Sequence, residues 1–103
     1  MSNHNVVLNY GGPGQFGPAP RTVTVRKGDT IRFIVGAGAV GDDTLRIKLR
    51  GAEHKGRDFT IEVTNDFPAR TTYDCELLDK SGNIRPGASI LGPAGGEIVL
   101  GGP

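Results

Sequence analysis

The residues that could carry chemistry are few and far apart in the chain. The 103-residue sequence contains one cysteine, Cys75, and two histidines, His4 and His54. A reactive cysteine needs an electropositive, partly exposed setting that lowers the pKa of its thiol. Cys75 instead alternates with Tyr73 and Leu77, which places it on the inward face of an expected strand, where a thiol packs as a small hydrophobe. We therefore interpret Cys75 as a core residue.

The histidines do not predict acid–base catalysis. His54 lies in the polar segment 51–58, which we expect to be a hairpin loop with charges of both signs, and His4 lies near the N-terminus. An acid–base site needs a nucleophile and an orienting partner beside the imidazole. The sequence has no Gly-x-Ser-x-Gly motif or comparable element to supply them. We therefore expect a protein that is not an enzyme and that uses no cofactor.

The adjacent carboxylates Asp42 and Asp43 suggest a calcium site at one end of the domain. Calcium takes six to eight oxygen ligands, and no loop in this sequence has the spacing of a dedicated calcium loop. Adjacent aspartates that follow a glycine are also common turn formers. The turn is the favoured interpretation, and calcium binding stays open as an alternative.

Three basic residues, Arg46, Lys48 and Arg50, share one face of an expected strand and could contact an anion. The acidic residues expected to point outward from neighbouring strands are Glu62, Asp74 and Glu76. Opposite charges on adjacent strands pair across a sheet and contribute a few tenths of a kcal/mol each. We therefore favour a ladder of ion pairs over an anion site.

Apolar residues in expected loops point to a contact surface. Segment 10–20 combines the aromatic residues Tyr10 and Phe16 with many glycines and prolines. It is expected to be either a mobile arm that binds a partner or a connector along one edge of the domain. Val40, Ile90 and Leu91 lie in further apolar turns, at 37–40 and 90–94, which could form a contact patch at one end of the domain. Apolar loop tips are unusual enough to raise a binding hypothesis.

The elements that must position these residues are short strands. Alternation of apolar and polar residues and β-branched content predict strands at 5–9, 22–26, 30–35, 44–50, 59–64, 71–78, 84–91 and 97–100. Clusters of Gly and Pro separate them, and no twelve-residue window has a helical stripe. The pattern predicts an all-β, two-sheet antiparallel sandwich of seven or eight strands. Residues 1–103 are expected to form one domain, with a connector at 10–20 and a short flexible tail at 101–103.

Two segments of this pattern resemble known sandwich families. Segment 22–33, which reads Thr-Val-Thr-Val-Arg-Lys-Gly-Asp-Thr-Ile-Arg-Phe, resembles the strand–turn–strand of cupredoxins. The Tyr73-x-Cys75 pair resembles the cupredoxin strand that carries the copper thiolate, and is also similar to the Tyr-x-Cys of immunoglobulin domains. The resemblance implies a cupredoxin-like or immunoglobulin-like sandwich.

The same resemblance implies that the copper ligands are missing. Blue copper needs two imidazoles and a thiolate with a weak axial ligand. In that family a His and a Met follow the Cys closely, whereas here the residues after Cys75 include neither, and the only methionine is Met1. We expect no bound metal.

Charge and composition also indicate which classes of partner and which location to expect. A net charge of +1 supplies no long-range field for nucleic acid or an anionic membrane, so nucleic acid is an unlikely partner and no membrane is expected. No apolar stretch approaches the ~18–20 residues that span a bilayer. The N-terminus lacks the features of a secretory signal, which indicates a cytoplasmic protein unless a signal has been removed.

The leading hypothesis is a non-enzymatic module on a β-sandwich that binds a protein partner or assembles with itself. Two alternatives stay open at this point. One is a module that binds a carbohydrate or calcium, and the other is a degenerate cupredoxin without copper.

Overall fold

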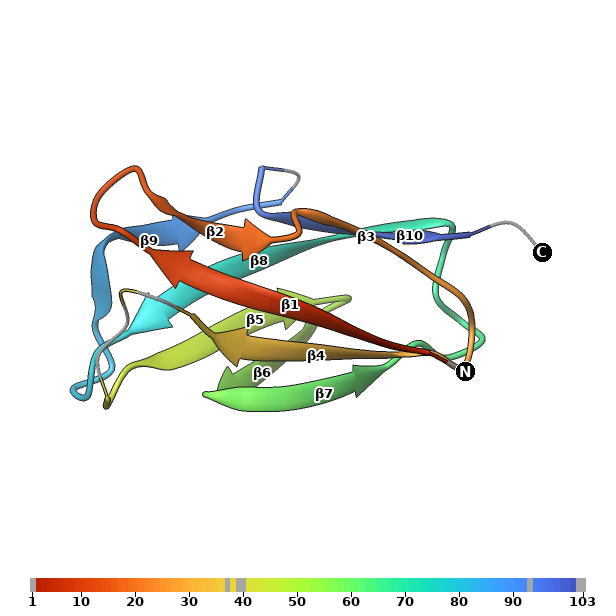
Figure 1. The fold of residues 1–103 in the computed structure, drawn as a ribbon, viewed down its shortest axis with the longest axis horizontal. Coiled ribbons are helices and arrows are strands. Elements are labelled where there is room, and N and C mark those ends of the chain that lie inside the picture. Colours follow the sequence, from red (N-terminus) through yellow and green to blue (C-terminus); the bar gives the residue numbers. More distant parts are fainter. Residues whose placement is uncertain (1, 37, 39–40, 93, 102–103) are drawn as a thin grey trace.

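The chain folds into two β-sheets packed face to face (Figure 1). The structure is a computed structural model that describes residues 2–36, 38, 41–92 and 94–101. The strands in these residues are β1 (Asn3–Tyr10), β2 (Phe16–Ala19), β3 (Thr22–Val25), β4 (Thr30–Val35), β5 (Thr44–Leu49), β6 (Ala52–Gly56), β7 (Asp58–Glu62), β8 (Arg70–Leu78), β9 (Ile84–Ile90) and β10 (Gly96–Leu100). No helix in these residues has the length and apolarity needed to cross a bilayer.

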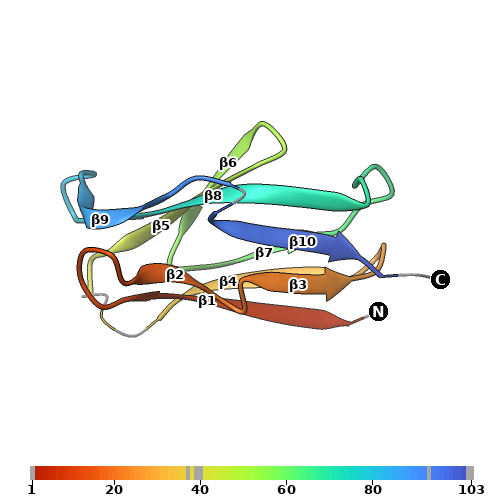
Figure 2. The ribbon, with the colours of Figure 1, turned by 90° about the horizontal axis from the view of Figure 1, so that it is seen from above.

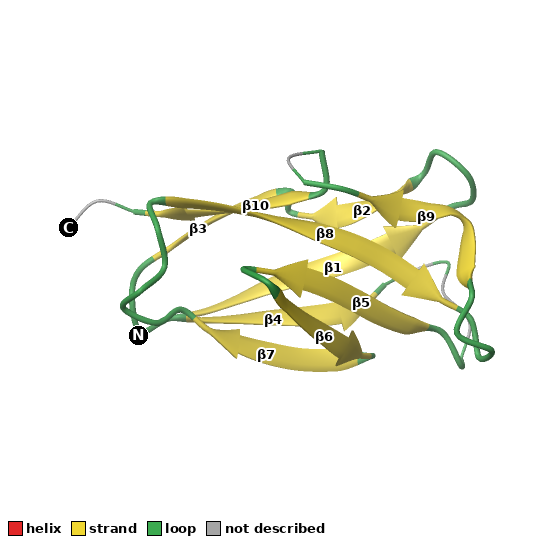
Figure 3. Ribbon diagram, turned by 180° about the vertical axis from the view of Figure 1, so that it is seen from behind, coloured by secondary structure: helices red, strands yellow, loops and turns green. Residues whose placement is uncertain are grey.

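The smaller sheet has the strand order β2-β1-β4-β7, and the larger has the order β3-β10-β8-β5-β6, with β9 also paired to β8. One edge of β8 pairs with β5. The other edge is shared, because β10 pairs with its first residues and β9 with its last. Figure 3 shows β9 and β10 following each other along β8. The loop that joins β9 to β10 therefore lies part-way along the sandwich.

The all-β sandwich is confirmed, but the sheets are mixed and not purely antiparallel. β1 pairs with β4 in parallel, and β3 pairs with β10 in parallel. The chain passes from the smaller sheet to the larger between β2 and β3, where the Ala19–Pro20 peptide bond is cis. β1 and β2 form an antiparallel hairpin in the smaller sheet, and β3 then joins the larger sheet. β1 and β3 each pair with a strand that is distant in the sequence, β4 and β10, and both of these pairs are parallel.

The described residues form ten strands, more than the seven or eight expected. The two additional strands, β2 and β6, occupy segments expected to be a connector and a loop. Glycine, proline and charge dominate these segments, so the local pattern did not indicate strands. Tertiary pairing supplies what propensity lacks, because β2 pairs with β1 and β6 pairs with β5.

The alternating apolar residues fill the space between the sheets. Leu45, Ile47 and Leu49 of β5 are buried, as their alternation predicts. The ring of Phe33 lies 5.3 Å edge-on from the ring of Tyr73 and 5.6 Å from the ring of Phe59. The contact between Phe33 and Tyr73 joins the two sheets within the core, and burying a side chain such as Phe33 contributes about 1.5–3 kcal/mol.

The two ends of the sandwich differ in what they carry. β1 begins and β10 ends at the same end, on the right in Figures 1 and 2. The opposite end carries the connections from β4 to β5 and from β8 to β9. The candidate sites suggested by the sequence therefore lie in three places. These are the end that carries the β4–β5 connection, the outer face of the larger sheet, and the side where β2 approaches β9.

Candidate functional site

The thiol of Cys75 is part of the core. Cys75 is fully buried, and its position in β8 lies opposite Ile47 of β5 and Ile90 of β9. Burial raises the pKa of the Cys75 thiol to about 12. A thiol that stays protonated and inaccessible is not a nucleophile, so the structural interpretation of Cys75 is supported by the geometry.

The two histidines lie in different sheets. His4 Nε2 is 2.9 Å from Asp29 Oδ2, and Asp29 also accepts hydrogen bonds from the backbone N–H groups of Ser2 and Arg26. These hydrogen bonds lower the pKa of Asp29, because they favour its charged form. His54 lies on β6, not in the expected loop, and its ring stacks on Phe59 at 6.1 Å. Each imidazole thus has a neighbour with a structural role, the Asp29 carboxylate for His4 and the Phe59 ring for His54.

The residues do not fit a copper site. In the larger sheet, His54 lies opposite Ile47, which lies opposite Cys75. Adjacent strands are about 4.8 Å apart, so the backbones at His54 and Cys75 are separated by roughly 10 Å. Within the described residues, no three His, Cys, Asp or Glu side chains form a group that could hold a metal ion. The chemistry of a trigonal copper site needs its imidazoles and thiolate around one point.

The carboxylate of Asp43 is held by an arginine. Asp43 is fully buried, and Nε of Arg85 donates to both of its carboxylate oxygens, at 2.8 and 2.9 Å. Arg57 donates to the Asp43 backbone carbonyl. Asp42 is exposed and borders a hollow of about 350 Å³. A calcium ion would have to displace Arg85 from Asp43, so the pair suggested by the sequence is not preformed for calcium.

The three basic residues predicted to share a strand face, Arg46, Lys48 and Arg50, are largely neutralised by neighbouring acidic residues. Arg46 binds the carboxylate of Glu76, and Lys48 Nζ lies 4.0 Å from the same carboxylate. Arg50 lies 3.0 Å from Asp66 and 4.6 Å over the ring of Phe67. The expected ion pairing is therefore found for Glu76. It is wrong for Glu62, which lies on β7 in the other sheet, and the Asp74 carboxylate instead accepts a hydrogen bond from the Gly92 N–H at 2.7 Å.

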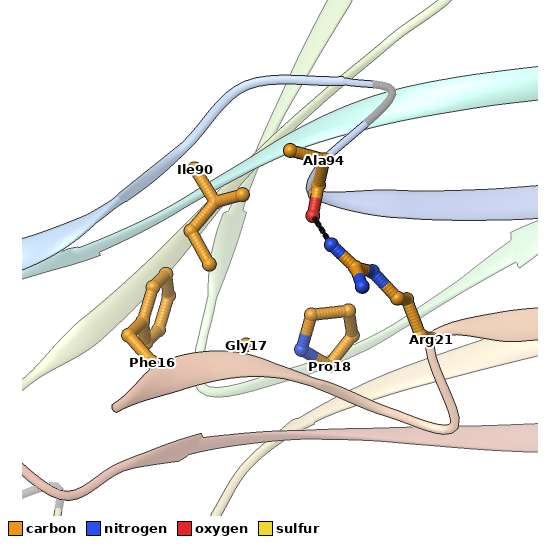
Figure 4. Close-up of a pocket in the computed structure, with 7 residues that line it drawn as sticks. Phe16, Gly17, Pro18, Arg21, Ile90 and Ala94 are labelled. Carbon is orange, nitrogen blue, oxygen red and sulfur yellow. Dashed lines mark hydrogen bonds between the residues drawn. The ribbon is translucent and has the colours of Figure 1, made fainter. Parts of the chain in front are cut away.

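A hollow of about 280 Å³ opens on the side of the sandwich where β2 and the end of β9 diverge. Residues 16–18 and Arg21 line it on one side, and Ile90, Ala94 and Gly95 line it on the other. Figure 4 shows the Arg21 guanidinium reaching across to donate a hydrogen bond to the Ala94 carbonyl. We call this the seam hollow. Apolar side chains and the Arg21 guanidinium both line it, and its exposed surface is more polar than apolar.

The structure brings some of the predicted contact residues together at the seam hollow. Phe16 and Ile90 line it, and Leu91, which directly follows Ile90, is 64% exposed. Tyr10 packs edge-on against Phe16 at 6.2 Å and donates a hydrogen bond to the Pro86 carbonyl at 2.7 Å. Tyr10 and Phe16 therefore belong to an anchored strand pair and not to a mobile arm. Val40 lies outside the described residues.

Sequence reasoning missed part of this hollow. Arg21, which lies 73 residues before Ala94, was not singled out, whereas Pro18 and Ala94 were considered only as parts of segment 10–20 and of the apolar turn at 90–94. The exchange of the chain between sheets at the Ala19–Pro20 bond is what brings these residues to the end of β9. The density of Gly and Pro in both segments was the available signal, and it indicated loops without indicating that they meet.

Comparison with solved structures agrees with the strand arrangement. A pseudoazurin from Sinorhizobium is similar to the whole of this chain with a TM-score of 0.52, and the match covers 76% of that protein. The fold is cupredoxin-like. The sequences are 21% identical, so the similarity concerns the fold alone. No protein-family model and no curated protein sequence matches this chain.

The structural likeness bears on which sandwich type this chain adopts. Of the two sandwich types that the sequence left open, the structural likeness supports the cupredoxin type. The scaffold carries Cys75 on a strand, as the sequence resemblance implied, but surrounds it with aliphatic neighbours.

Proposed function

We propose that the protein is a non-enzymatic binding module that associates with a second copy of itself through the seam hollow and Leu91. The observation that carries the proposal is the position of Leu91. It is 64% exposed and directly follows Ile90, which lines the seam hollow together with Phe16. An exposed apolar side chain next to a hollow lined in part by apolar side chains can form part of an interaction surface.

A second copy suits this surface because protrusion and hollow occur together on it. A two-fold interface uses the same patch on both subunits, so each copy presents the group that the other accepts. Leu91 of each copy can enter the seam hollow of the other, next to Ile90 and Phe16. The net charge of +1 gives only weak repulsion between copies.

Sedimentation velocity over a range of protein concentration tests the proposal. We expect the sedimentation coefficient to rise with concentration, and Leu91→Asp to weaken association at least ten-fold, because it removes about 1.5–3 kcal/mol of apolar burial per copy. Ile84→Asp is the matched control, since Ile84 is also exposed, at 43%, but lies at the other end of β9.

Two outcomes would contradict the proposal. One is a protein that stays monomeric at every concentration. The other is an equal loss of association in the Leu91→Asp and Ile84→Asp variants, which would indicate a general effect of added charge and not a contact at the seam.

A further inference from the structure

The strands at the sheet edges are not equally protected against pairing with another chain. An edge strand offers unpaired N–H and C=O groups, and proteins block such edges with proline, charge or irregular backbone. β2 carries Pro18, and β9 carries Pro86. β6 and β7 carry charges of their own, as their sequences Ala-Glu-His-Lys-Gly and Asp-Phe-Thr-Ile-Glu show.

β3 has none of these features. Its sequence, Thr-Val-Thr-Val, consists only of β-branched residues, which strongly favour the extended conformation. Val23 and Val25 are 6% and 1% exposed and anchor the strand in the core, while Thr22 and Thr24 are exposed. β3 ends the larger sheet, with β10 as its partner and no strand on its other side in the described part of the chain.

The hydrogen bonds of the neighbouring residues show which groups face outward. The Arg21 and Val25 carbonyls accept from the N–H groups of Glu97 and Gly101, so residues 21, 23 and 25 face β10. In a parallel ladder the alternate residues face the opposite edge. The outward N–H and C=O groups are therefore those of Thr22 and Thr24. The next outward residue, Arg26, already bonds Asp29 through both its N–H and its C=O.

The charges around this edge select the occupant. Arg21 precedes the strand, and Arg26 and Lys27 follow it, and all three are exposed. Two copies of β3 paired antiparallel with Thr24 opposite Thr24, which sets outward residues against each other, would place Arg21 opposite Lys27, and like charges in this position are destabilising. An extended segment with acidic residues at its ends would instead meet a positive charge at each end of the strand.

The geometry points to the outer edge of β3 as a strand-addition site for an extended, acidic-flanked segment of another protein. The incoming segment forms main-chain hydrogen bonds with Thr22 and Thr24, and its acidic ends lie near Arg21 and near Arg26 and Lys27. Main-chain pairing supplies the affinity in this mode, and flanking charges supply selectivity. The site shares Arg21 with the border of the seam hollow, but it uses the outer edge of β3 and a different partner, so strand addition does not require the proposed self-association.

A peptide with the sequence Glu-Glu-Val-Thr-Val-Thr-Val-Glu-Glu is a direct probe, with binding followed by two-dimensional NMR on the labelled protein. We expect shifts centred on residues 21–27 and at least ten-fold slower hydrogen exchange at the Thr22 and Thr24 amides when the peptide is bound. The same peptide with lysines in place of the glutamates should bind at least ten-fold more weakly. Added salt should reduce this difference, because it screens exposed charges.

Two controls separate main-chain pairing from side-chain binding. A peptide N-methylated throughout its five-residue core keeps its side chains but lacks donors, and should lose binding. The Thr24→Pro variant removes an outward donor without touching the ladder to β10, and it should also lose binding while Leu91→Asp keeps it. The inference is overturned if the N-methylated peptide binds as well as the parent, if the shifts map to Phe16, Ile90 and Ala94 of the seam hollow and not to residues 22–27, or if millimolar peptide causes no shifts.

Discussion

The fully buried carboxylate of Asp43 is bound by Arg85, whose Nε and Nη2 atoms lie 2.8 Å from Asp43 Oδ1. Asp43 immediately precedes β5, and Arg85 lies in β9. The ion pair therefore links the β4–β5 connection with the β8–β9 hairpin. It fastens the end of the sandwich opposite to the start of β1.

Substitutions of Arg85 and of Asp43 should lower the free energy of unfolding by different amounts. Arg85→Met leaves the Asp43 carboxylate buried without its guanidinium, whereas Asp43→Asn leaves an arginine whose side chain is 31% exposed and can reach water. We expect Arg85→Met to lower the free energy of unfolding more than Asp43→Asn does, because it takes the Arg85 guanidinium away from a fully buried charge, whereas Asp43→Asn removes that charge. Urea unfolding of both single variants and the double variant measures this. Strictly additive losses in the double variant would contradict a direct coupling.

Tyr73 offers a stabilising substitution. Its hydroxyl is buried and has no hydrogen-bond partner among the described residues, while its ring packs against Phe33. We expect Tyr73→Phe to raise the free energy of unfolding by about 1 kcal/mol, because it removes an unsatisfied polar group and keeps the ring. Thermal unfolding should show a midpoint several degrees higher, roughly 4–8 °C for a domain of this size.

Tyr10→Phe is the matched control for Tyr73→Phe. The Tyr10 hydroxyl donates to the Pro86 carbonyl at 2.7 Å, so its removal should lower stability by about 0.5–1.5 kcal/mol. Opposite signs for the two variants are the expected result. A loss of stability in Tyr73→Phe equal to that in Tyr10→Phe would show that the Tyr73 hydroxyl is satisfied in solution.

Cys75 should resist thiol reagents as long as the protein is folded. Burial raises the pKa of its thiol to about 12, and the side chain is inaccessible. We expect the rate of labelling by a disulfide reagent at pH 8 to be limited by opening of the structure and to rise by orders of magnitude in denaturing urea. Fast stoichiometric labelling of the native protein would contradict the position of Cys75 in the core.

Asp29 should make stability depend on pH in the acid range. Three hydrogen bonds lower its folded pKa below the ordinary value of 3.8, so the unfolded chain binds more protons as pH falls below about 4. The contribution of Asp29 is therefore complete at neutral pH and is lost in acid. We expect Asp29→Asn to be less stable than the parent at pH 7 and to show a flatter decline between pH 5 and pH 2 in urea titrations.

Asp66→Asn provides the comparison for Asp29. Arg50 and Thr64 lower the pKa of Asp66 to about 2, but its side chain is 70% exposed. Solvent screens exposed ion pairs, so this substitution should change stability much less than Asp29→Asn. Equal effects would mean that the burial of Asp29 adds nothing to its role.

The sequence was most informative where alternation and burial coincide. The strands β3, β4, β5 and β8 were expected within one or two residues of their observed bounds, because each has buried apolar residues at every second position. The inward position of Cys75 followed from the same alternation.

The strands that alternation does not mark were missed. β2 reads Phe-Gly-Pro-Ala and β6 reads Ala-Glu-His-Lys-Gly, and neither sequence favours a strand by itself. They are extended because β1 and β5 offer them a hydrogen-bonded edge. The parallel pairings were missed for a related reason, since the register of β1 with β4 and of β3 with β10 depends on contacts between distant parts of the chain.

The candidate sites depend on such contacts even more strongly. The bond from Arg21 to the Ala94 carbonyl and the pair of Asp43 with Arg85 join residues 73 and 42 positions apart. No local spacing in the sequence encodes either of them. A sequence pattern could identify Leu91 as an apolar loop residue, but only the fold places it beside the seam hollow.

The arrangement of the chain ends has a practical consequence for immobilised protein. Since β1 begins and β10 ends at one end of the sandwich, a tag on either terminus anchors the molecule from the same side. A sensor surface coated through an N-terminal or a C-terminal tag would then display the Asp43–Arg85 end outward in both orientations. The long flanks of the sandwich, where the seam hollow and the β3 edge lie, would stand perpendicular to the coating and remain open to molecules in solution.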